Sequence, residues 1–466
     1  INGVYHVSTG GVINLHQSAN KEIDLFGDFV FDNGGTINIY GGSSKSIWGF
    51  GDLNIIMDGG VFDFKDNGID ILNLSQYITN YSISGGTIRT AGGFRCFDTD
   101  FSIPGGTVEF YSSKNAHLSM AAGVQLGNVI INKDSEEKDD NYAGESANDR
   151  NNIQNIRKSS GQSVLVIDVG NNIVNDLTIN KGMMGLSEVA RLKVLGNLVI
   201  NNGGSLVLFG NCELALADLS TLTVNNGGLI EFNGVPGMES KITHNSSGYY
   251  ALNIESGGKI GAKYAIFEYM DTNGVNVKSG AIVDPVKSFN NCLFRNGQNG
   301  GRLLTIENDQ TFSVNYAVFP DNIWGGNFSV YKSVNSGVVT FGGHSGDFSG
   351  DSYEYDLYSR IHWGGEVAGH VELQGVVIES GQDICFDASN TLTVAGGGNT
   401  FVVQDGGNVN LIAGKHIHML EGTSVHSGAY LHAFISNDYC TLPPAMLAME
   451  EDNDAINETV SEKSSE

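Results

Sequence analysis

The side chains best suited to acid–base chemistry gather in one segment, GGHSGDFSGDSYEYDLYSR, residues 342–360. Hydrolysis of a glycosidic bond needs two carboxylates, one acting as acid and the other as base or nucleophile. Strand alternation would place Glu354 and Asp356 on one face. The alternative is a turn followed by a polar strand face, because Asp and Ser favour turns for backbone reasons, and we favour it. The candidates are His344, Asp347, Asp351, Glu354, Asp356 and Arg360.

A second cluster combines two aspartates with an arginine. In the sequence FDTDF, Asp98 and Asp100 alternate along an expected strand, with Arg95 beside them. Alternate residues share one face of a strand, so both carboxylates would point the same way. A solvated strand face accounts for this pattern without any chemistry, and we favour that interpretation.

Histidine is concentrated near the end of the strand-rich part of the chain. KHIHML, residues 415–420, puts two histidines on one strand face, and two more follow about half a coil later. Stacked coils could bring these imidazoles together, and neutral imidazole binds zinc and copper. Histidines on an exposed strand face are more often plain surface residues, so the sequence leaves a metal site open. The four are His416, His418, His426 and His432.

Motifs for nucleotide or acyl chemistry are missing from the sequence. The Gly-x-Gly matches lie between strands with no following helix, which phosphate binding requires, and no Gly-x-Ser-x-Gly occurs. EEDNDAINE, residues 450–458, is acidic but lacks the glycine of an EF-hand loop. The sequence therefore assigns no catalytic or cofactor-binding residue and predicts no cofactor, with loosely bound calcium as the one alternative.

The elements that must position these residues are short strands bracketed by glycine pairs. SISGGTIRTAGG, residues 82–93, alternates apolar and polar residues between two such pairs. Glycine pairs that open related strands recur every 20 to 26 residues, beginning at 34, 59, 85 and 105. This is the length of one turn of a β-solenoid with two or three short strands per coil. Related segments are GGTINIYGG (34–42), GGVFDF (59–64), GGTVEF (105–110), GGSLVL (203–208) and GGLIEF (227–232).

We therefore predict an all-β protein folded as a right-handed parallel β-helix. Strands bounded by glycine cannot bury an apolar face alone, but stacked about 4.8 Å apart they share one continuous interior. About twenty coils would form a rod of roughly 90–100 Å, and its hand follows the general rule for parallel β connections. Asn-Asn-Gly-Gly at 201–204 and 225–228 predicts asparagines stacked from coil to coil through their amides.

The β-helix is expected to be interrupted once. Coils are predicted over residues 1–133 and again over 163–440, with more decoration at 310–365. The polar and mostly acidic segment 134–162 predicts an exposed insertion loop. Residues 441–466, which are acidic with little to bury, predict a flexible tail.

Composition excludes several classes of partner. The chain has 25 Lys and Arg against 52 Asp and Glu, giving a net charge of −27, which repels nucleic acid and anionic headgroups. No apolar run approaches the about 18 residues that a membrane span needs. No basic signal segment precedes Ile1, so any signal peptide is expected to have been removed or left out. We expect neither a nucleic-acid partner nor a membrane span.

Cysteine is scarce, and its positions follow no metal-binding spacing. An odd number of five excludes a complete set of intrachain disulfides. We interpret these residues as small buried hydrophobes, so they leave the redox compartment undetermined. They are Cys96, Cys212, Cys292, Cys385 and Cys440.

Three stretches resemble a known family. They run over 81–133 (YSISGGTIRTAGG…LGNVIINK), 336–365 (SGVVTFGGHSGDFSGDSYEYDLYSRIHWGG) and 408–435 (NVNLIAGKHIHMLEGTSVHSGAYLHAFI). They resemble large secreted parallel β-helix proteins of Bacteroidetes-type bacteria, which are substrates of the type IX secretion system and often adhesin-like. The resemblance implies a secreted protein or one on the extracellular cell surface, with the secretion machinery and outer-membrane surface components as partners. Such proteins usually end in a sorting domain that is cut off, whereas the residues after Cys440 are not expected to fold as such a domain and could be the stub that remains after processing.

The predicted function is structural or adhesive, with a rigid repeat protein presenting its loops, and we favour a protein that is not an enzyme. Two alternatives stay open. One is a polysaccharide lyase or glycoside hydrolase built on a parallel β-helix. The other is a non-catalytic glycan-binding module, in which exposed Trp48, Trp324 or Trp363 would stack on sugars. Glycans and host or cell surfaces are accordingly expected as further partners.

Overall fold

The computed structural model describes most of the chain as stacked strands. The described residues are 2–16, 23–32, 34–40, 47–65, 71–74, 80–96, 102–113, 115–121, 123–134, 163–167, 170–364, 370–388 and 391–436. Apart from its first residue, the expected insertion loop at 134–162 lies outside this set, as does the expected tail at 441–466.

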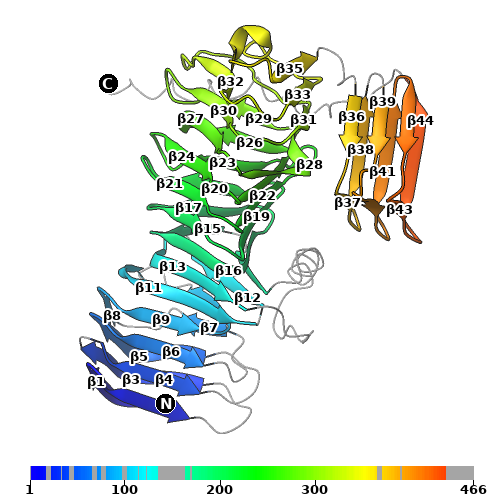
Figure 1. Cartoon of the computed structure of the whole chain (residues 1–466). Helices are drawn as coiled ribbons and strands as arrows, with labels where there is room; N and C mark the ends of the chain where they lie inside the picture. The colour runs from blue at the N-terminus through cyan, green and yellow to red at the C-terminus, as the bar shows by residue number, and fades with distance from the viewer. Residues whose placement is uncertain are drawn as a thin grey trace, which may run out of the picture.

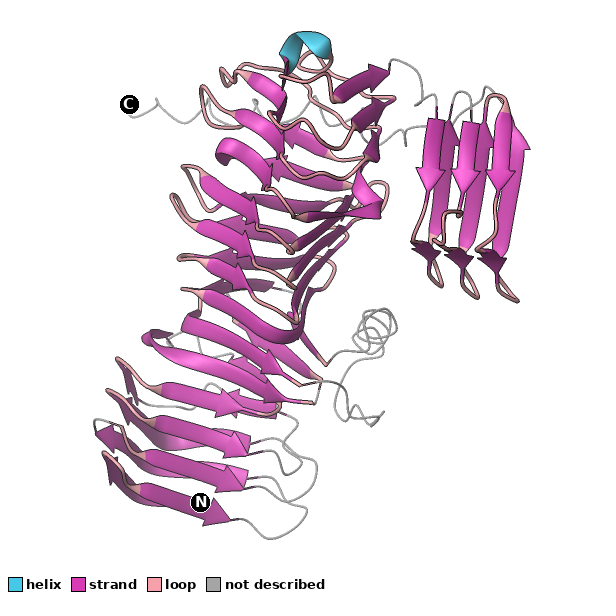
Figure 2. Cartoon of the chain, viewed as in Figure 1, coloured by secondary structure: helices cyan, strands magenta, loops and turns pink. Residues whose placement is uncertain are grey.

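Every pairing between two named strands is parallel, and no α-helix occurs among the described residues. A single 3₁₀ turn, η1 (Asp351–Tyr353), is the one helical element there (Figure 2). The predicted all-β parallel solenoid is therefore confirmed. Residues 2–364 form the main solenoid of about 14 turns, and residues 370–436 form a second, shorter solenoid (Figure 1).

The strands follow in chain order. Those of the first part of the main solenoid are β1 (Asn2–Ser8), β2 (Val12–His16), β3 (Ile23–Asp32), β4 (Thr36–Tyr40), β5 (Ile47–Met57), β6 (Val61–Lys65), β7 (Ile71–Leu74), β8 (Asn80–Ile83), β9 (Thr87–Thr90), β10 (Gly93–Cys96), β11 (Ser102–Ser112), β12 (Ala116–Met120) and β13 (Gln125–Lys133). Those of its second part are β14 (Val164–Ile167), β15 (Gly170–Val174), β16 (Leu177–Leu186), β17 (Ala190–Val194), β18 (Leu198–Ile200), β19 (Gly204–Phe209), β20 (Glu213–Leu216), β21 (Thr221–Val224), β22 (Leu229–Asn233), β23 (Ser240–His244), β24 (Tyr250–Ile254), β25 (Lys259–Lys263), β26 (Ala265–Glu268), β27 (Met270–Val277), β28 (Ile282–Asn290), β29 (Leu293–Arg295), β30 (Arg302–Ile306), β31 (Phe312–Asn315), β32 (Phe328–Lys332), β33 (Val339–Gly342), β34 (Glu354–Asp356) and β35 (Ile361–Gly364). Those of the second solenoid are β36 (His370–Leu373), β37 (Val376–Ile378), β38 (Asp383–Ala388), β39 (Thr391–Val394), β40 (Phe401–Val403), β41 (Asn408–Ala413), β42 (His416–Met419), β43 (Thr423–Val425) and β44 (Tyr430–Ile435).

Coils of the main solenoid change from two strands to three along its length. Near the N-terminus, β1, β3 and β5 pair in succession on one face, and β2, β4 and β6 on the other. Further along, β17, β20 and β23 form a separate third face. Glycine pairs mark corners where successive coils touch. At Gly60 φ is +78°, and a Cβ there would lie 2.3 Å from the carbonyl oxygen of Gly35, so only glycine fits.

An apolar core fills the interior of the coils, with aromatic rings stacked along the axis. The ring centroids of Phe29 and Phe62 are 5.2 Å apart, and those of Phe267 and Phe294 are 5.1 Å apart. Phe294 continues to Phe319 at 5.3 Å. All five are fully buried, and burial of such a side chain contributes about 1.5–3 kcal/mol. The parallel register produces the column of Phe267, Phe294 and Phe319, because it places one inward position directly above the next, whereas Phe29 and Phe62 come from opposite faces and meet across the interior.

The second solenoid is a separate stack with its own core. Its three sheets each contain three strands, for example β38, β41 and β44 in succession. Val376, Phe401 and Leu411 belong to a core cluster distinct from that of the main solenoid. In Figure 1 this stack stands beside the later coils of the main solenoid. The sequence predicted coils continuing without a break over 163–440, whereas the structure places the last coils in a second stack.

A ladder of asparagines runs along the outside of the main solenoid. Asn180 donates to the Oδ1 of Asn132 at 2.9 Å, Asn201 to Asn180 at 2.7 Å, and Asn225 to Asn201 at 2.8 Å. Each amide can donate to one neighbour and accept from the other, so identical residues satisfy one another. The predicted stacking of Asn201 on Asn225 is confirmed, and Asn132 extends the ladder to the Oε1 of Glu109 at 2.7 Å.

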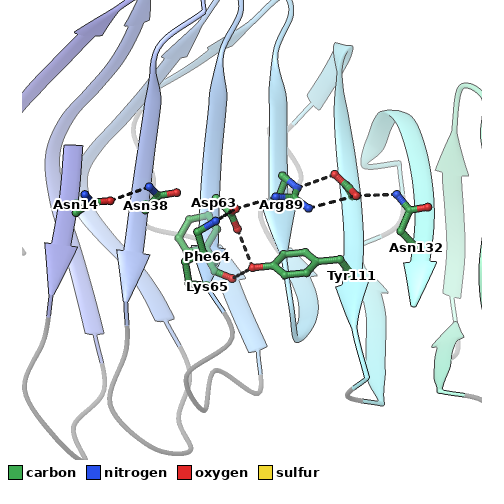
Figure 3. Close-up of polar contacts among 9 residues, drawn as sticks. Asn14, Asn38, Asp63, Phe64, Lys65, Arg89, Tyr111 and Asn132 are labelled. Atoms are coloured by element: carbon green, nitrogen blue, oxygen red, sulfur yellow. Dashed lines mark hydrogen bonds and ion pairs between the residues drawn. The ribbon is translucent and has the colours of Figure 1, made fainter. Parts of the chain in front are cut away.

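Charged residues continue this ladder toward the N-terminus (Figure 3). Arg89 lies between two carboxylates, with Nε 2.7 Å from Glu109 Oε2 and Nη1 3.0 Å from Asp63 Oδ2. Lys65 Nζ is 2.6 Å from the same Asp63 oxygen, and the hydroxyl of Tyr111 donates to Asp63 Oδ1 at 2.8 Å. Asp63 is only 1% exposed. Its carboxylate therefore holds together groups from three coils.

We predict that Asp63→Ala lowers the free energy of unfolding by about 1.5–3 kcal/mol, because it removes the carboxylate that Lys65 and the hydroxyl of Tyr111 contact and leaves Arg89 with Glu109 alone. Chemical denaturation followed by circular dichroism measures this loss. Lys181→Ala is the matched control, since Lys181 forms an ion pair with Asp134 in which both side chains are mostly exposed. The control should lose no more than about 1 kcal/mol. Equal losses in the two variants would contradict the role given to Asp63.

Candidate functional site

The acid–base candidates lie in the last coils of the main solenoid. Residues 343–350 form turns and bends between β33 and η1, and β34 then carries three half-buried side chains. This arrangement is the turn and polar strand that we favoured from the sequence. It nevertheless brings some of the candidates together around one tryptophan.

Glu354 and Trp363 form the centre of this group, which we call the cap site. The indole Nε1 of Trp363 donates to Glu354 Oε2 at 2.5 Å. Burial raises the pKa of Glu354 to about 7, although the hydrogen bond from Trp363 opposes the shift. The negative charges of Asp356 and Asp351 add to the increase. Glu354 is therefore protonated in a large fraction of molecules at neutral pH.

His344 lies on the other side of Trp363. The two rings meet edge to face, with centroids 4.7 Å apart, and His344 Nδ1 is 3.0 Å from the hydroxyl oxygen of Ser349. Ser349 donates its own proton to the carbonyl oxygen of Gly346 at 2.7 Å, so Nδ1 of His344 must be the donor to Ser349. Burial lowers the pKa of His344, which keeps the ring neutral and leaves Nε2 as an acceptor.

The remaining candidates of this segment do not join Glu354 in an acid–base pair. Asp356 accepts hydrogen bonds from the backbone N–H groups of Tyr358 at 3.2 Å and Ile361 at 2.6 Å, so it stabilises a turn. Arg360 donates to the side chain of Asn335 at 2.7 Å. Asp347 is exposed. The cap site therefore consists of His344, Glu354 and Trp363, with Asp351 close enough to affect both titratable groups.

Aromatic rings surround the cap site. Phe341 stacks under Trp363 at 4.3 Å between centroids, and Trp324 packs edge to face against Phe348 at 5.6 Å. Both tryptophans are half-buried, so they are not the fully exposed platforms that the glycan-binding alternative described. The side chain of Trp48, the third tryptophan of that alternative, lies outside the described residues.

The histidine candidates stay apart. His416 and His418 are neighbours on β42, with ring centroids 5.9 Å apart, whereas His432 packs against Phe434 on β44. His426 follows β43, and all four are exposed. Within the described part of the chain, no group of three or more His, Cys, Asp or Glu residues could hold a metal ion.

Two other candidate regions fall where the structure gives no description. Asp98, Asp100 and the side chain of Arg95 lie outside the described residues. The acidic segment 450–458, named for loose calcium binding, also lies outside them.

The cysteines divide into two kinds. Cys96, Cys212 and Cys292 are buried and form no disulfide, as expected from the sequence. Burial raises the pKa of the thiols of Cys212 and Cys292, which makes them unreactive. Cys385 differs, because it is exposed on β38 and disulfide-bonded. Interpreting Cys385 as a small buried hydrophobe was therefore wrong.

The sequence analysis missed a second group of titratable residues where the two solenoids meet. Glu231, Lys263 and Lys287 come from the main solenoid, and Glu379 comes from the second one. The sequence carried no signal for this group, because strand spacing says nothing about contacts between coils that are 90 or more residues apart. By contrast, Glu354 and Trp363 are only nine positions apart, a separation that fits one corner of a coil.

No protein-family model matches this chain, and no curated protein matches it. Among the described residues, no helix is both long and apolar enough to cross a membrane.

We predict that the indole N–H proton of Trp363 follows the titration of Glu354. Its chemical shift in a ¹H–¹⁵N spectrum should change with a midpoint near pH 7, because Glu354 gains negative charge as the pH rises through its pKa. Glu354→Gln should abolish this titration, whereas Glu372→Gln, at an exposed residue of the second solenoid, should leave it intact. A Trp363 signal that stays constant between pH 5 and 9 would contradict the pKa given to Glu354.

Proposed function

We propose that this chain is an extracellular structural or adhesive protein, a stiff rod that presents its turns to other surfaces. The observation that carries the proposal is the long parallel stack of about 14 turns, whose outward polar columns bond to one another. Such a stack serves as a spacer and a scaffold, because each coil contacts only its neighbours.

The turns support an adhesive role. Several large apolar side chains are exposed where the chain passes between strands, including Leu219 at 86%, Ile323 at 88% and Leu357 at 58%. Each lies outside the regular strands. Exposed apolar residues presented by a rigid frame are suited to contacts with a partner surface.

The disulfide at Cys385 supports an extracellular location, because disulfides persist in oxidising compartments and are rare in the cytosol. More specifically, we propose that the protein is exported by the type IX secretion system of a Bacteroidetes-type bacterium. It rests on the sequence resemblance described above, as do the secretion machinery and outer-membrane components as partners.

Surface labelling of the producing cells tests this proposal. In intact cells, proteinase K should degrade the protein and a membrane-impermeant biotin reagent should label it, because its coils would face the medium. Cells lacking the type IX outer-membrane pore should retain it unlabelled. A cytoplasmic enzyme in the same samples is the control for cell integrity. Protection of the protein in intact cells, with labelling only after lysis, would contradict an extracellular location.

The cap site favours one second candidate function, cleavage of glycosidic bonds. A carboxyl group that is largely protonated at neutral pH is suited to general-acid chemistry, and burial gives Glu354 this property. Glu354 would protonate the leaving oxygen, while Asp351 would take a proton from the water molecule that attacks the anomeric carbon. Asp356 acts more strongly on Glu354, but its two oxygens already accept backbone N–H groups.

For this second candidate, we predict that wild-type protein shortens at least one of pectin, alginate or a host glycan. Glu354→Gln should lower the rate at least 100-fold, because loss of a general acid costs about 10²–10⁴ in rate. Reducing-end release measures the activity. Glu372→Gln should behave as wild type. Equal rates in the two variants would exclude the cap site, and an absence of cleavage would exclude the enzymatic candidate for these substrates.

A further inference from the structure

A cavity of about 410 Å³ lies where the two solenoids meet, and we call it the junction cavity. The main solenoid contributes the outward side chains of β19, β22 and β28, including Val207, Leu229 and Lys287. The second solenoid contributes β37 and the turn that follows it, including Val377 and Glu379. Figure 1 shows β37 at the lower end of the second solenoid, beside the main one. The cavity exists only while the two solenoids are in contact.

A bulge in β28 builds one wall of the cavity. Ile260 and Ala262 of β25 pair with Val283 and Ser288, so the four residues 284–287 stand opposite Gly261 alone and three of them are extra. The neighbouring β25 carries Gly261 beneath them, where a Cβ would lie 3.2 Å from Asp284 Cβ. Bulges of this kind redirect side chains near functional sites.

The bulge also attaches the second solenoid. Val286 is 8% exposed and belongs to the core cluster of the second solenoid, although it comes from the main one. Asp284 Oδ1 accepts hydrogen bonds from the N–H groups of Val286 at 2.9 Å and Lys287 at 2.8 Å, which fixes the bulge. Away from the bulge, the hydroxyl of Tyr316 donates to Asp387 of the second solenoid at 2.5 Å. The two solenoids are therefore joined at the bulge and again at Tyr316.

Opposite the bulge, a tight turn orients the polar groups of the second solenoid. The N–H of Glu379 donates to Gln382 Oε1 at 2.7 Å, and the N–H of Gln382 donates back to the carbonyl oxygen of Glu379 at 3.1 Å. Gly375, at the edge of the cavity, has no atom within 4 Å of where a Cβ would stand, so space is open there.

Charged groups of both signs meet at this cavity. Lys287 Nζ is 2.5 Å from Glu231 Oε1, and both side chains are largely buried. Lys263 on β25 and the carboxylate of Glu379 make no ion pair or side-chain hydrogen bond within the described residues. Burial and the charge of Lys287 lower the pKa of Lys263 to about 8, and burial raises the pKa of Glu379. In the part of the chain that the structure describes, neither the amine of Lys263 nor the carboxylate of Glu379 therefore has an ion-pair or hydrogen-bond partner that would stabilise its charged form.

A third unsatisfied group lies next to Lys263. Asn233 pairs with Lys263 across adjacent strands, and its Oδ1 is buried without a hydrogen-bond partner. Buried polar atoms are nearly always hydrogen-bonded. Of these three groups, the carboxylate of Glu379 lines the cavity, whereas Lys263 and Asn233 lie behind the lining residues Glu231 and Lys287. An unpaired carboxylate in the lining, with an unpaired amine and acceptor behind it, indicates a ligand that both donates and accepts hydrogen bonds.

We propose that the junction cavity binds one or two sugar rings of a neutral oligosaccharide. Sugar hydroxyls both donate and accept, so they can satisfy Glu379 and Lys263 together. The apolar walls at Val207, Leu229 and Val377 suit the C–H face of a sugar ring, and the volume lies in the range of small-molecule sites, about 300–1,000 Å³.

The charges of the site select a neutral ligand. Three carboxylates, Glu231, Asp284 and Glu379, line the cavity with one amine, Lys287, and a second amine, Lys263, lies close enough to interact with Glu231 and Glu379. An acidic sugar would add a fourth negative charge to a partly buried site, at a cost in desolvation and repulsion. This proposal does not depend on where the protein resides, and it concerns residues separate from those of the cap site.

Binding to the purified full chain tests the proposal. Saturation-transfer NMR and calorimetry would use two sets of tetrasaccharides, one built from neutral hexoses and one from uronic acids. Wild-type protein should bind at least one neutral member and prefer it to its uronic-acid counterpart. Val377→Trp, which places a large ring in the cavity, and Lys263→Met, which removes the unpaired amine, should each weaken binding at least tenfold.

Matched variants separate the site from general effects. Lys259→Met changes an exposed lysine on the same strand as Lys263, and it should bind as wild type. Glu354→Gln should also bind as wild type, because the cap site is separate. Unchanged thermal midpoints in Lys263→Met and Val377→Trp would exclude unfolding as the cause. The proposal fails if no neutral tetrasaccharide binds, if the uronic acids bind better, or if Val377→Trp binds normally. These binding measurements use isolated protein, so their result is independent of the surface-labelling experiment. The two proposals can therefore fail separately.

Discussion

The parallel, in-register stacking of coils is the constraint on which this structure depends. It places each side chain directly over its counterpart in the next coil. Outward side chains at equivalent positions of adjacent coils must therefore be compatible with one another. Like charges opposite one another destabilise strands, which leaves two solutions. Amides can repeat, as in the Asn180, Asn201 and Asn225 ladder. Charges can alternate, as where Lys241 lies 3.6 Å from Glu213 and 3.0 Å from Glu268 in the adjacent coils.

The same constraint explains where chemistry can occur. In regular coils, the outward polar side chains form hydrogen bonds and ion pairs with their counterparts in adjacent coils. Polar groups without partners therefore occur where the coil repeat is interrupted. The cap site lies in the last coils of the main solenoid, where turns replace strands and Trp363 meets Glu354. The junction cavity lies where a bulge in β28 interrupts the sheet. In both places, burial shifts the pKa of a carboxyl group that the repeat would otherwise have paired.

The sequence was sufficient for the fold but not for the sites. Glycine pairs and alternating strands predicted the parallel solenoid, and the Asn-Asn-Gly-Gly repeat predicted the stacking of Asn201 on Asn225, because both are properties of one coil and its neighbour. The placement of the second solenoid depends instead on Val286, whose contact partners are some 90 residues away. Periodicity cannot report such a contact. For the same reason, the sequence named Glu354 without its partner, and it treated Cys385 as buried although strand β38 turns it outward.

The direction of the backbone hydrogen bonds has a mechanical consequence for the main solenoid. These bonds run along the axis of the stack, so a pull on its two ends would load the contacts between coils in series. Each contact would carry the full tension, and the rod would open first at its weakest coil-to-coil seam. The asparagine and ion-pair ladders span several such seams. Under tension, these ladders would add side-chain contacts between adjacent coils to the backbone hydrogen bonds at each seam that they cross.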